Sequence, residues 1–154
     1  MEMSDCVFCD ILSGQLPSSI VYRDDRCTAF MDIQPVNSGH LLVVPNLHAA
    51  SLAQVEDHLA AHIFRVAKHL ATALRNSGIK CEGVNLFLAD GEAAGQEVFH
   101  VHLHVFPRFQ GDGFGFKSHP SYSQKPGRAE LEADARRIRK ALAAAEKTQS
   151  RTKI

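Results

Sequence analysis

The chain has 154 residues, a length that suits one ordinary domain and can bury a core without disulfide bonds. Lysine plus arginine and aspartate plus glutamate both number 17, so the composition gives no sign of a nucleic-acid partner or an anionic membrane surface. No apolar run approaches the roughly 20 residues of a membrane span and the N-terminus lacks a signal-peptide pattern, so we expect a cytoplasmic protein whose cysteines are thiols or metal ligands.

The first part of the chain predicts a short helix and three strands. Residues 6–13 (CVFCDILS) have the apolar spacing of a two-turn helix, which Gly14 and Pro17 end. The stretches SIVYRDD and CTAFMDI predict a hairpin, and HLLVVP predicts a third strand after a loop that contains Pro35 and Gly39. Three successive strands therefore precede the first long helix.

A helical period begins after the third strand. Residues 55–77 place their apolar side chains on one stripe, which predicts a long helix that covers the sheet. A pair of histidines at i, i+4 could bind a metal only with further ligands, which the sequence does not supply at that face. The opposite, polar face of the helix, which we interpret as a solvated surface, carries His58, His62, Arg65 and His69.

Two further strands and a second helix complete the predicted fold. The stretches VNLFLADG and VFHVHLHVFPR, the latter ended by Pro107, predict a hairpin joined by the loop GEAAGQE. Residues 110–127 predict a long irregular segment, residues 129–147 an alanine-rich helix, and residues 148–154 a disordered tail. Strands and helices without regular alternation favour an α+β fold with an antiparallel sheet of about five strands, in one domain over residues 1–147.

Three histidines at two-residue spacing, His100, His102 and His104, give the strongest chemical signal. In a strand, side chains at i, i+2 and i+4 point to the same face, so these imidazoles would line one side while the apolar residues between them face the long helix. One or two such histidines would be read as solvent-facing. Three leave two interpretations open, namely a metal site and a histidine nucleophile with neighbouring helpers.

The loop before the histidine row favours phosphate chemistry. Backbone N–H groups between Gly91 and Gly95, together with Gln96, could cradle an anionic phosphate. Imidazole can attack phosphorus to give a labile P–N intermediate, which requires a fixed tautomer such as a hydrogen bond to a carbonyl provides. Neighbouring imidazoles could then donate to the phosphoryl oxygens as negative charge develops.

The motif HVHLHVF, preceded by AAGQEVF, resembles that of the histidine triad (HIT) family of nucleotide hydrolases and transferases. The resemblance extends upstream through CVFCDILSG, FMDIQPVNSGHLLVVP and GVNLFLADGEAAGQ, so it covers residues 6–108. It implies a HIT-like fold, a homodimer and His102 as the nucleophile that takes the α-phosphoryl nucleotide. It also implies a phosphate site of His40, Asn85, Gly95, Gln96 and His104, and a base and ribose pocket of Val7, Phe8, Ile11, Phe30, Asp32 and Ile33.

The chain departs from the family pattern at Glu97, where some members place a serine or threonine to bind the phosphate or assist the leaving group. A carboxylate beside a phosphate is repulsive unless it is protonated or turned away. We therefore predict that Glu97 contributes through its backbone N–H or not at all. The spacing HVHLH favours the hydrolase branches over the galactose-1-phosphate uridylyltransferase branch, which typically carries a proline between its first two histidines.

Cys6 and Cys9 form a C-x-x-C motif, which is typical of a redox or a metal site. A redox dithiol is expected within an alternation of strands and helices, which this chain lacks, so zinc is favoured. Two cysteines supply half of a tetrahedral site. The resemblance implies His48 and His100 as the other ligands of a structural zinc, because zinc-bearing bacterial members pair these positions with the motif; a reduced, metal-free pair is the alternative.

These observations predict a nucleotide hydrolase that works through a covalent nucleotidyl-histidine intermediate. Dinucleoside polyphosphates and purine nucleoside phosphoramidates both stay open as substrates, and the irregular segment after the triad leans toward the first class. Phe114 and Phe116 of that segment are expected to anchor it, while Lys117 and Lys125 could meet distant phosphates or be solvated. The alternative is a non-catalytic nucleotide- or zinc-binding module with an interaction role.

Overall fold

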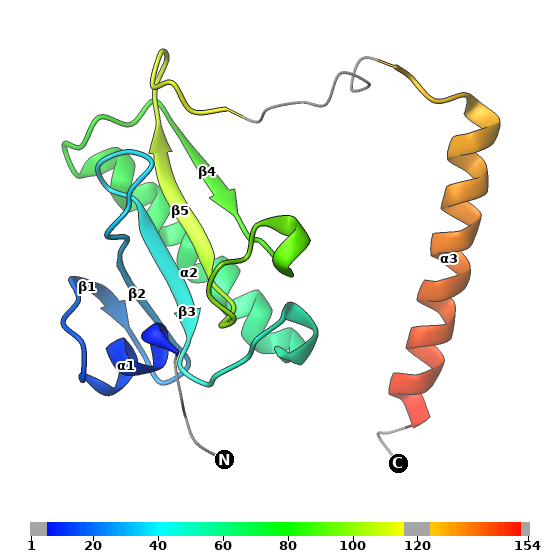
Figure 1. Cartoon of the computed structure of the whole chain (residues 1–154), viewed down its shortest axis with the longest axis horizontal. Helices are drawn as coiled ribbons and strands as arrows, with labels where there is room; N and C mark the ends of the chain where they lie inside the picture. Colours follow the sequence, from blue (N-terminus) through cyan, green and yellow to red (C-terminus); the bar gives the residue numbers. More distant parts are fainter. Residues whose placement is uncertain (1–5, 116–123, 152–154) are drawn as a thin grey trace. The chain divides into compact units, whose positions relative to one another are not determined.

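The computed structural model describes residues 6–115 and 124–151, which divide into two compact units. The first unit, Met1–Phe114, holds the sheet, and the second, Gly115–Ile154, holds the helix α3 (Arg128–Arg151) (Figure 1). The predicted tail at residues 148–154 is wrong over its first part, because α3 continues to Arg151; residues 152–154 lie outside the described residues. The single domain expected over residues 1–147 stays a prediction.

Five antiparallel strands form one sheet in the order β1-β2-β3-β5-β4, which confirms the predicted α+β class. Consecutive strands are neighbours except at β5, which lies between β3 and β4 (Figure 1). This insertion puts the last strand, and with it His104, in the interior of the sheet. The strands are β1 (Ile20–Arg23), β2 (Cys27–Met31), β3 (Leu41–Pro45), β4 (Gly83–Phe87) and β5 (Leu103–Arg108).

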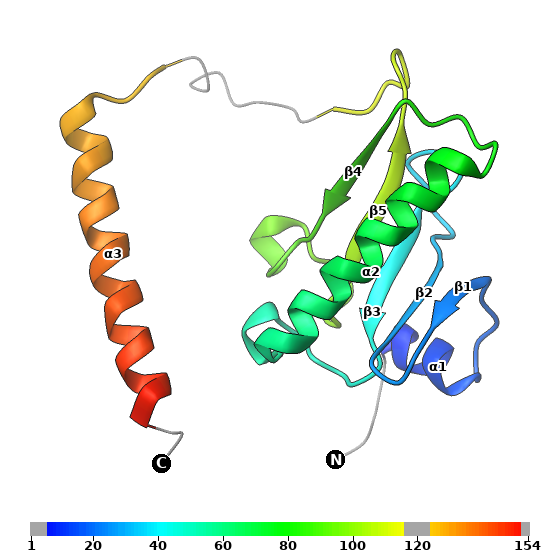
Figure 2. The same cartoon turned by 180° about the vertical axis from the view of Figure 1, so that it is seen from behind.

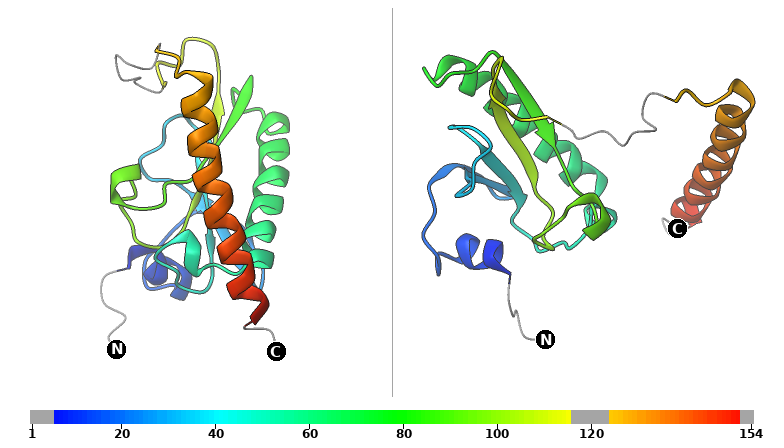
Figure 3. Two further views of the ribbon diagram at one scale, coloured as in Figure 1. Left: turned by 90° about the vertical axis from the view of Figure 1, so that its right-hand side faces the viewer. Right: turned by 45° about the horizontal axis from the view of Figure 1, so that its top comes forward.

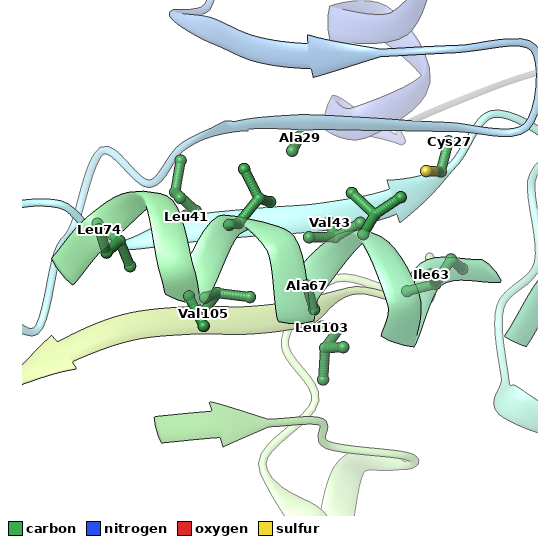
Figure 4. Packing of buried hydrophobic residues seen from close by; sticks show 12 residues of the cluster. Cys27, Ala29, Leu41, Val43, Ile63, Ala67, Leu74, Leu103 and Val105 are labelled. Atoms are coloured by element: carbon green, nitrogen blue, oxygen red, sulfur yellow. The ribbon is translucent and has the colours of Figure 1, made fainter. Parts of the chain in front are cut away.

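The long helix α2 (Asp57–Asn76) covers one face of the sheet, as its apolar stripe predicted (Figure 2). Ile63, Val66, Leu70 and Leu74 of the stripe are buried against strand residues of β2, β3 and β5. Figure 4 shows this layer, in which the helix side chains lie over alternate positions of the strands. Burial of this apolar surface is the main favourable contribution to folding of the unit. Among the described residues, no helix is long and apolar enough to cross a membrane.

The opposite face of the sheet is covered in part by the short helix α1 (Val7–Ser13), which ends at Gly14 in the left-handed region at φ 81° (Figure 3). Phe8 of α1 packs on Phe30, Leu42 and Val44, side chains that alternate with those facing α2. Two 3-10 helices lie in the connections of this unit, η1 (Leu52–Gln54) between β3 and α2 and η2 (Glu92–Ala94) between β4 and β5.

The last strand begins five residues later than predicted, at Leu103 rather than Val98. The backbone before it bonds elsewhere, since the N–H of Val101 donates to the carbonyl of Ala49 at 2.7 Å instead of entering the sheet ladder. Pro107 lies within the strand rather than after it. Pairing with β3 ends at Val105, so Pro107 has a strand neighbour on one side only, a place where a missing N–H is tolerated.

One histidine of the supposed solvated face of α2 is buried, which corrects that interpretation. His62 is 7% exposed, and its Nε2 lies 2.6 Å from a carboxylate oxygen of Asp24. The guanidinium of Arg65 can only donate to His62 Nδ1, at 3.0 Å, so His62 Nε2 carries the hydrogen that it donates to Asp24. His58, Arg65 and His69 are exposed as expected. The Asp24 and His62 pair therefore joins the β1–β2 turn to α2.

We expect Asp24→Asn to lower the free energy of unfolding by about 1–3 kcal/mol at pH 7, because hydrogen bonds to a charged group are lost. Burial alone would raise the pKa of Asp24, but hydrogen bonds from Cys27, Tyr22, Arg26 and His62 outweigh it and hold that pKa well below its usual range. Because the pKa of Asp24 is lower in the folded state, its charge stabilises the fold at pH values above the unfolded-state pKa of about 3.9. The stability deficit of the Asp24→Asn variant should therefore shrink as the pH falls below that value.

Urea unfolding of both proteins at pH 7 and pH 3.5 measures this difference. Asp25→Asn is the matched control. The side chain of Asp25 is 85% exposed and its ion pair with Arg26 is long, at 4.0 Å, so the loss of its charge should cost less than about 0.5 kcal/mol. Equal stability of the Asp24 and Asp25 variants would contradict the structural role assigned to Asp24.

Candidate active site

A pocket of about 780 Å³ opens on the face of the sheet that carries α1. Its walls come from α1, from the end of β2, from the loop after η2 and from β5. Most of the predicted site residues meet here although they are far apart in the chain. They are Val7, Phe8, Ile11, Phe30, Asp32, Ile33, His40, Gly95, His102 and His104.

The alternation of β5 places the histidines in the pocket. Leu103 and Val105 face α2 in the apolar core, so His104 and Phe106 point to the other face. His102 lies directly before the strand and lines the same pocket. His100 does not reach it; its side chain is fully buried and turns toward α1. The expected row therefore divides into one buried imidazole and two in the pocket.

The tautomer of His102 is fixed by the backbone. Its Nδ1 lies 2.7 Å from the carbonyl oxygen of His100, which can only accept, so Nδ1 carries the hydrogen. The other ring nitrogen, Nε2, is then the basic one. The ring stands between Phe8 and His104, with ring centroids 5.1 Å and 4.9 Å away. The arrangement gives an oriented imidazole with an available nucleophilic nitrogen.

A second hydrogen-bond chain fixes the tautomer of His104. The backbone N–H of Val36 donates to His40 Nδ1 at 3.0 Å, so the hydrogen of His40 lies on Nε2. That nitrogen is 2.9 Å from His104 Nδ1, which must accept. His104 Nε2 therefore carries a hydrogen. The pocket thus holds a hydrogen-bond donor beside the basic nitrogen of His102.

Burial keeps these helper imidazoles neutral. It lowers the pKa of His104 to about 4, and the neighbouring rings of His102 and His40 act in the same direction. Burial also lowers the pKa of His40, although the Asp32 carboxylate, 3.5 Å from His40 Nε2, opposes it. Near pH 7 His104 therefore donates one hydrogen bond as an uncharged group rather than as an imidazolium.

Four ligand atoms of Cys6, Cys9, His48 and His100 lie within 4.8 Å of one another. Sγ of Cys9 is 3.4 Å from His48 Nδ1, and His100 Nδ1 is 3.4 Å from Sγ of Cys6 and 3.6 Å from that of Cys9. Metal bonds of about 2.3 Å to sulfur and 2.0–2.1 Å to nitrogen at tetrahedral angles put S and N about 3.5 Å apart. The residues present therefore fit a tetrahedral zinc ion.

His100 connects this ligand cluster to the pocket. Its Nε2 lies 2.9 Å from the carbonyl of Pro45, which fixes the hydrogen there and leaves Nδ1 free to bind a metal. Its own carbonyl accepts the hydrogen bond from His102 Nδ1. The same residue thus offers a metal ligand with its side chain and orients His102 with its backbone.

The side chain of Gln96, a predicted phosphate ligand, does not reach the pocket. Gln96 is buried, and its side chain bonds to the backbone of its own loop and its neighbour, with Oε1 accepting from Gly91 and Nε2 donating to Ala50 and Val98. It braces the loop instead of contacting a ligand. Asn85 lies on β4 directly opposite Phe106, so it faces the same side of the sheet as the pocket, and its phosphate role stays a prediction. Sequence position alone could not show where the amide of Gln96 points.

The pocket also has an aromatic wall that sequence reasoning did not identify, which includes Phe87, Phe106 and Phe114. Phe114 packs edge-on against Phe106 at 5.4 Å, which agrees with the expected anchoring but also puts it in the pocket. Asp112 holds this turn, because its carboxylate accepts from Arg108 at 2.6 and 2.8 Å and from the N–H of Phe114 at 3.1 Å. An aspartate between two glycines after a strand is the turn signal that could have revealed it. Phe116 and Lys117 lie outside the described residues.

Glu97 also lines the pocket, at its exposed rim. The expectation that Glu97 contributes through its backbone N–H or not at all stays a prediction. The adjacent Gly95, in the left-handed region at φ 86°, brings the backbone of the loop to the same rim.

Comparison with known proteins agrees with this architecture. The model of the HIT domain matches residues 13–111. An uncharacterized HIT-like protein of Borreliella burgdorferi is 49% identical over 117 residues, which cover 75% of this chain and 84% of the relative. The adenylylsulfatase HINT3 of Arabidopsis thaliana is 35% identical over 112 residues, 71% of this chain and 55% of that protein.

Solved structures give the same result. A HIT family protein of Bacillus anthracis superposes with a TM-score of 0.80 at 37% identity and covers 90% of this chain and 97% of its own. A zinc-bound histidine triad family protein of Mycobacterium smegmatis reaches a TM-score of 0.70 at 42% identity, with 77% and 84% covered. The matched residues span more than half of the chain, and the chain belongs to the HIT family.

Proposed function

We propose that the protein is a nucleotide hydrolase that acts at the α-phosphate, with His102 as the nucleophile. The observation that carries the proposal is the 2.7 Å contact of His102 Nδ1 with the His100 carbonyl, which leaves Nε2 basic in the pocket. The adenylylsulfatase activity in the name of the Arabidopsis relative supports the reaction class. A hydrolase needs an oriented nucleophile and a donor for the phosphoryl oxygens, and His102 and His104 meet these needs.

The proposed reaction has two displacements at phosphorus. In the first, the lone pair of His102 Nε2 forms a bond to the α-phosphorus while the bond to the leaving group breaks, and the leaving group departs with that electron pair and takes up a proton. In the second, water attacks the same phosphorus and the P–N bond breaks. The nucleoside monophosphate departs, and the free imidazole of His102 is regenerated. His104 Nε2 donates to a phosphoryl oxygen in both steps, held in that tautomer by His40.

The nucleoside would occupy the end of the pocket next to α1. Val7, Phe8 and Ile11 of the helix and Phe30 of β2 provide apolar surface for a planar base, and the Asp32 carboxylate can accept hydrogen bonds from ribose hydroxyls. The backbone of the loop at Gly95 would approach the phosphate, in place of the side chain of Gln96.

We further propose a structural zinc held by Cys6, Cys9, His48 and His100, supported by the fit of their ligand atoms and by the zinc-bound relative. When bound, such an ion joins α1, the loop after β3 and the segment before β5, and it takes no part in the bond changes. Four protein ligands close its coordination. Its contribution would be to hold Phe8 and the His100 carbonyl against His102.

Replacement of His102 by alanine should abolish turnover, by at least about 10³-fold in kcat, because the covalent route is lost. Wild type and variant are incubated with an adenosine phosphoramidate and with diadenosine tetraphosphate, and products are followed by chromatography and bound nucleotide by intact mass. We expect an adenylyl adduct on the wild type alone. His69→Ala, on the exposed face of α2, is the matched control and should keep full activity. Failure of the wild type to turn over either substrate would overturn the hydrolase proposal and favour a binding module.

Loss of one zinc ligand, in Cys9→Ala, should reduce bound zinc from one equivalent to near zero and lower the melting temperature by more than about 5 °C, because metal binding stabilises the folded state. Elemental analysis and thermal unfolding, with and without a chelator, measure both effects. Cys81→Ala serves as control, since that thiol lies apart from the cluster and contacts the Gly83 carbonyl. The site would be refuted if the wild-type protein were purified without zinc, bound none of the zinc added to it and gained no stability from that zinc.

A further inference from the structure

The ligand cluster of Cys6, Cys9, His48 and His100 has one buried side and one open side. His100 is fully buried, and its Nδ1 faces Sγ of Cys6 at 3.4 Å. On the other side His48 is exposed, and the half-buried Cys9 lies against it, with 3.4 Å between Sγ and Nδ1. Buried cysteines are inert, whereas a partly exposed thiolate can react with solutes. The open side therefore gives small molecules access to Cys9.

The two thiols of the cluster are placed to bond to each other. Cys6 is the N-cap of α1 and Cys9 lies in the first turn, where its backbone N–H donates to Sγ of Cys6 at 3.4 Å. Both sulfurs belong to the ligand atoms that lie within 4.8 Å of one another. Side chains three residues apart on a helix are neighbours, so a disulfide needs movement of this one turn only. The other two cysteines lie elsewhere: Cys27 is fully buried in the core beneath α2, and the thiol of Cys81 donates to the Gly83 carbonyl.

Two groups that contact His102 are carried by this cluster. Phe8 stands between the two cysteines in the chain, and its ring centroid lies 5.1 Å from that of His102. The Nδ1 of His100 faces both sulfurs, while the His100 carbonyl accepts the hydrogen bond that fixes the tautomer of His102. A change in the separation of the two sulfurs therefore reaches His102 through α1 and through His100.

We propose that Cys6 and Cys9 form a thiol–disulfide switch, in which oxidation by a hydroperoxide lowers the reactivity of His102. The inference rests on the proposed zinc site and hydrolase function and adds a means of regulation to them. Thiolates that share a zinc ion at about 2.3 Å stand about 3.8 Å apart, whereas disulfide sulfurs are bonded at about 2 Å. Oxidation therefore draws the ends of the first turn of α1 together, releases the ion and leaves His48 and the His100 side chain without a shared anchor.

The oxidation proceeds in two displacements, the first at oxygen and the second at sulfur. Cysteines that bind zinc are deprotonated, and the thiolate is the nucleophile. The Cys9 thiolate attacks one oxygen of hydrogen peroxide, the S–O bond forms as the O–O bond breaks, and hydroxide leaves and takes up a proton. The Cys6 thiolate then attacks Sγ of Cys9, the S–S bond forms as the S–O bond breaks, and a second hydroxide leaves and takes up a proton. The two sulfurs lose two electrons, and the peroxide is reduced to two molecules of water.

The expected loss of activity is partial, because the oxidised protein keeps every residue of the pocket. Groups that orient a functional residue from behind are typically worth about 10- to 100-fold in activity, and we expect kcat/KM to fall by about tenfold. The ring nitrogens of His102 should report the same change, since its hydrogen is no longer held on Nδ1 by a fixed carbonyl. A thiol reductant together with zinc should restore both, because disulfide formation is reversible.

The test follows zinc-loaded protein treated with a small excess of hydrogen peroxide. A zinc-binding dye measures the released ion, intact mass and peptide mapping without reductant identify the disulfide, and 15N NMR reports which ring nitrogen of His102 carries the hydrogen. We expect loss of one equivalent of zinc, a disulfide between Cys6 and Cys9, mixed tautomers of His102 and the tenfold fall in kcat/KM with an adenosine phosphoramidate. Dithiothreitol and zinc should reverse all four changes.

Cys9→His separates the switch from zinc binding, because it removes the accessible thiol and puts another zinc ligand at its position. Peroxide at the same dose should leave the zinc content of this variant, and its own starting rate, unchanged. Cys81→Ala is the matched control for a thiol outside the cluster, and it should respond to peroxide as the wild type does.

Retention of zinc and activity after peroxide, oxidation of Cys27 or Cys81 in place of the pair, or the same loss in Cys9→His would each overturn the inference. A disulfide that leaves the His102 tautomer and kcat/KM unchanged would overturn it as well. Failure of the underlying proposals is seen separately. Protein that binds no zinc before peroxide is added refutes the zinc site and the switch together. Protein without the hydrolase function shows no turnover in the reduced state, where zinc release, the disulfide and the NMR signal of His102 still decide the switch.

Discussion

The hydrogen bond between His102 Nδ1 and the His100 carbonyl is the constraint on which the rest of the site depends. It determines which nitrogen of His102 is basic, and so whether the residue can attack an electrophile in the pocket. The carbonyl is itself held in place, because His100 is fully buried, bonds to Pro45 through Nε2 and faces two cysteines through Nδ1. Reactivity at the pocket therefore depends on packing around a residue that never enters it.

The sheet makes this arrangement possible because its last strand is inserted between β3 and β4. An interior strand has partners on both sides, so side chains that alternate along β5 have well-defined directions: one set enters the core under α2, and the other lines the pocket. His104 is part of this ladder, opposite Leu42 and Phe87. His102 lies just outside the ladder, where the segment before β5 bonds to Ala49 instead. His102 can thus bond to the carbonyl of His100, two residues earlier, a contact that regular strand geometry would not offer.

Much of this could be predicted from periodicity and from the family resemblance. The apolar stripe of α2 and the alternation in β5 follow from spacing that packing enforces. The meeting of α1 with the histidines was implied by the family resemblance alone. Side-chain direction outside regular elements does not follow from spacing. Gln96 bonds to backbone groups of Gly91 and Val98 in its own loop and of Ala50, 46 residues away. His62 became buried because Asp24, 38 residues away, offered a carboxylate. Neither Ala50 nor Asp24 is visible in the local sequence of its partner.

The burial that lowers the pKa of His40 and His104 keeps both uncharged near pH 7, and this has a consequence for the ligands the pocket can hold. A site with imidazolium groups could bind a polyphosphate by attraction alone, whereas neutral donors contribute directional hydrogen bonds of modest strength. Such donors become valuable when charge develops on the phosphoryl oxygens during attack, because they are already oriented and need not be desolvated again. The low pKa of His104 therefore favours stabilisation of a reacting phosphate over tight binding of a highly charged ground state.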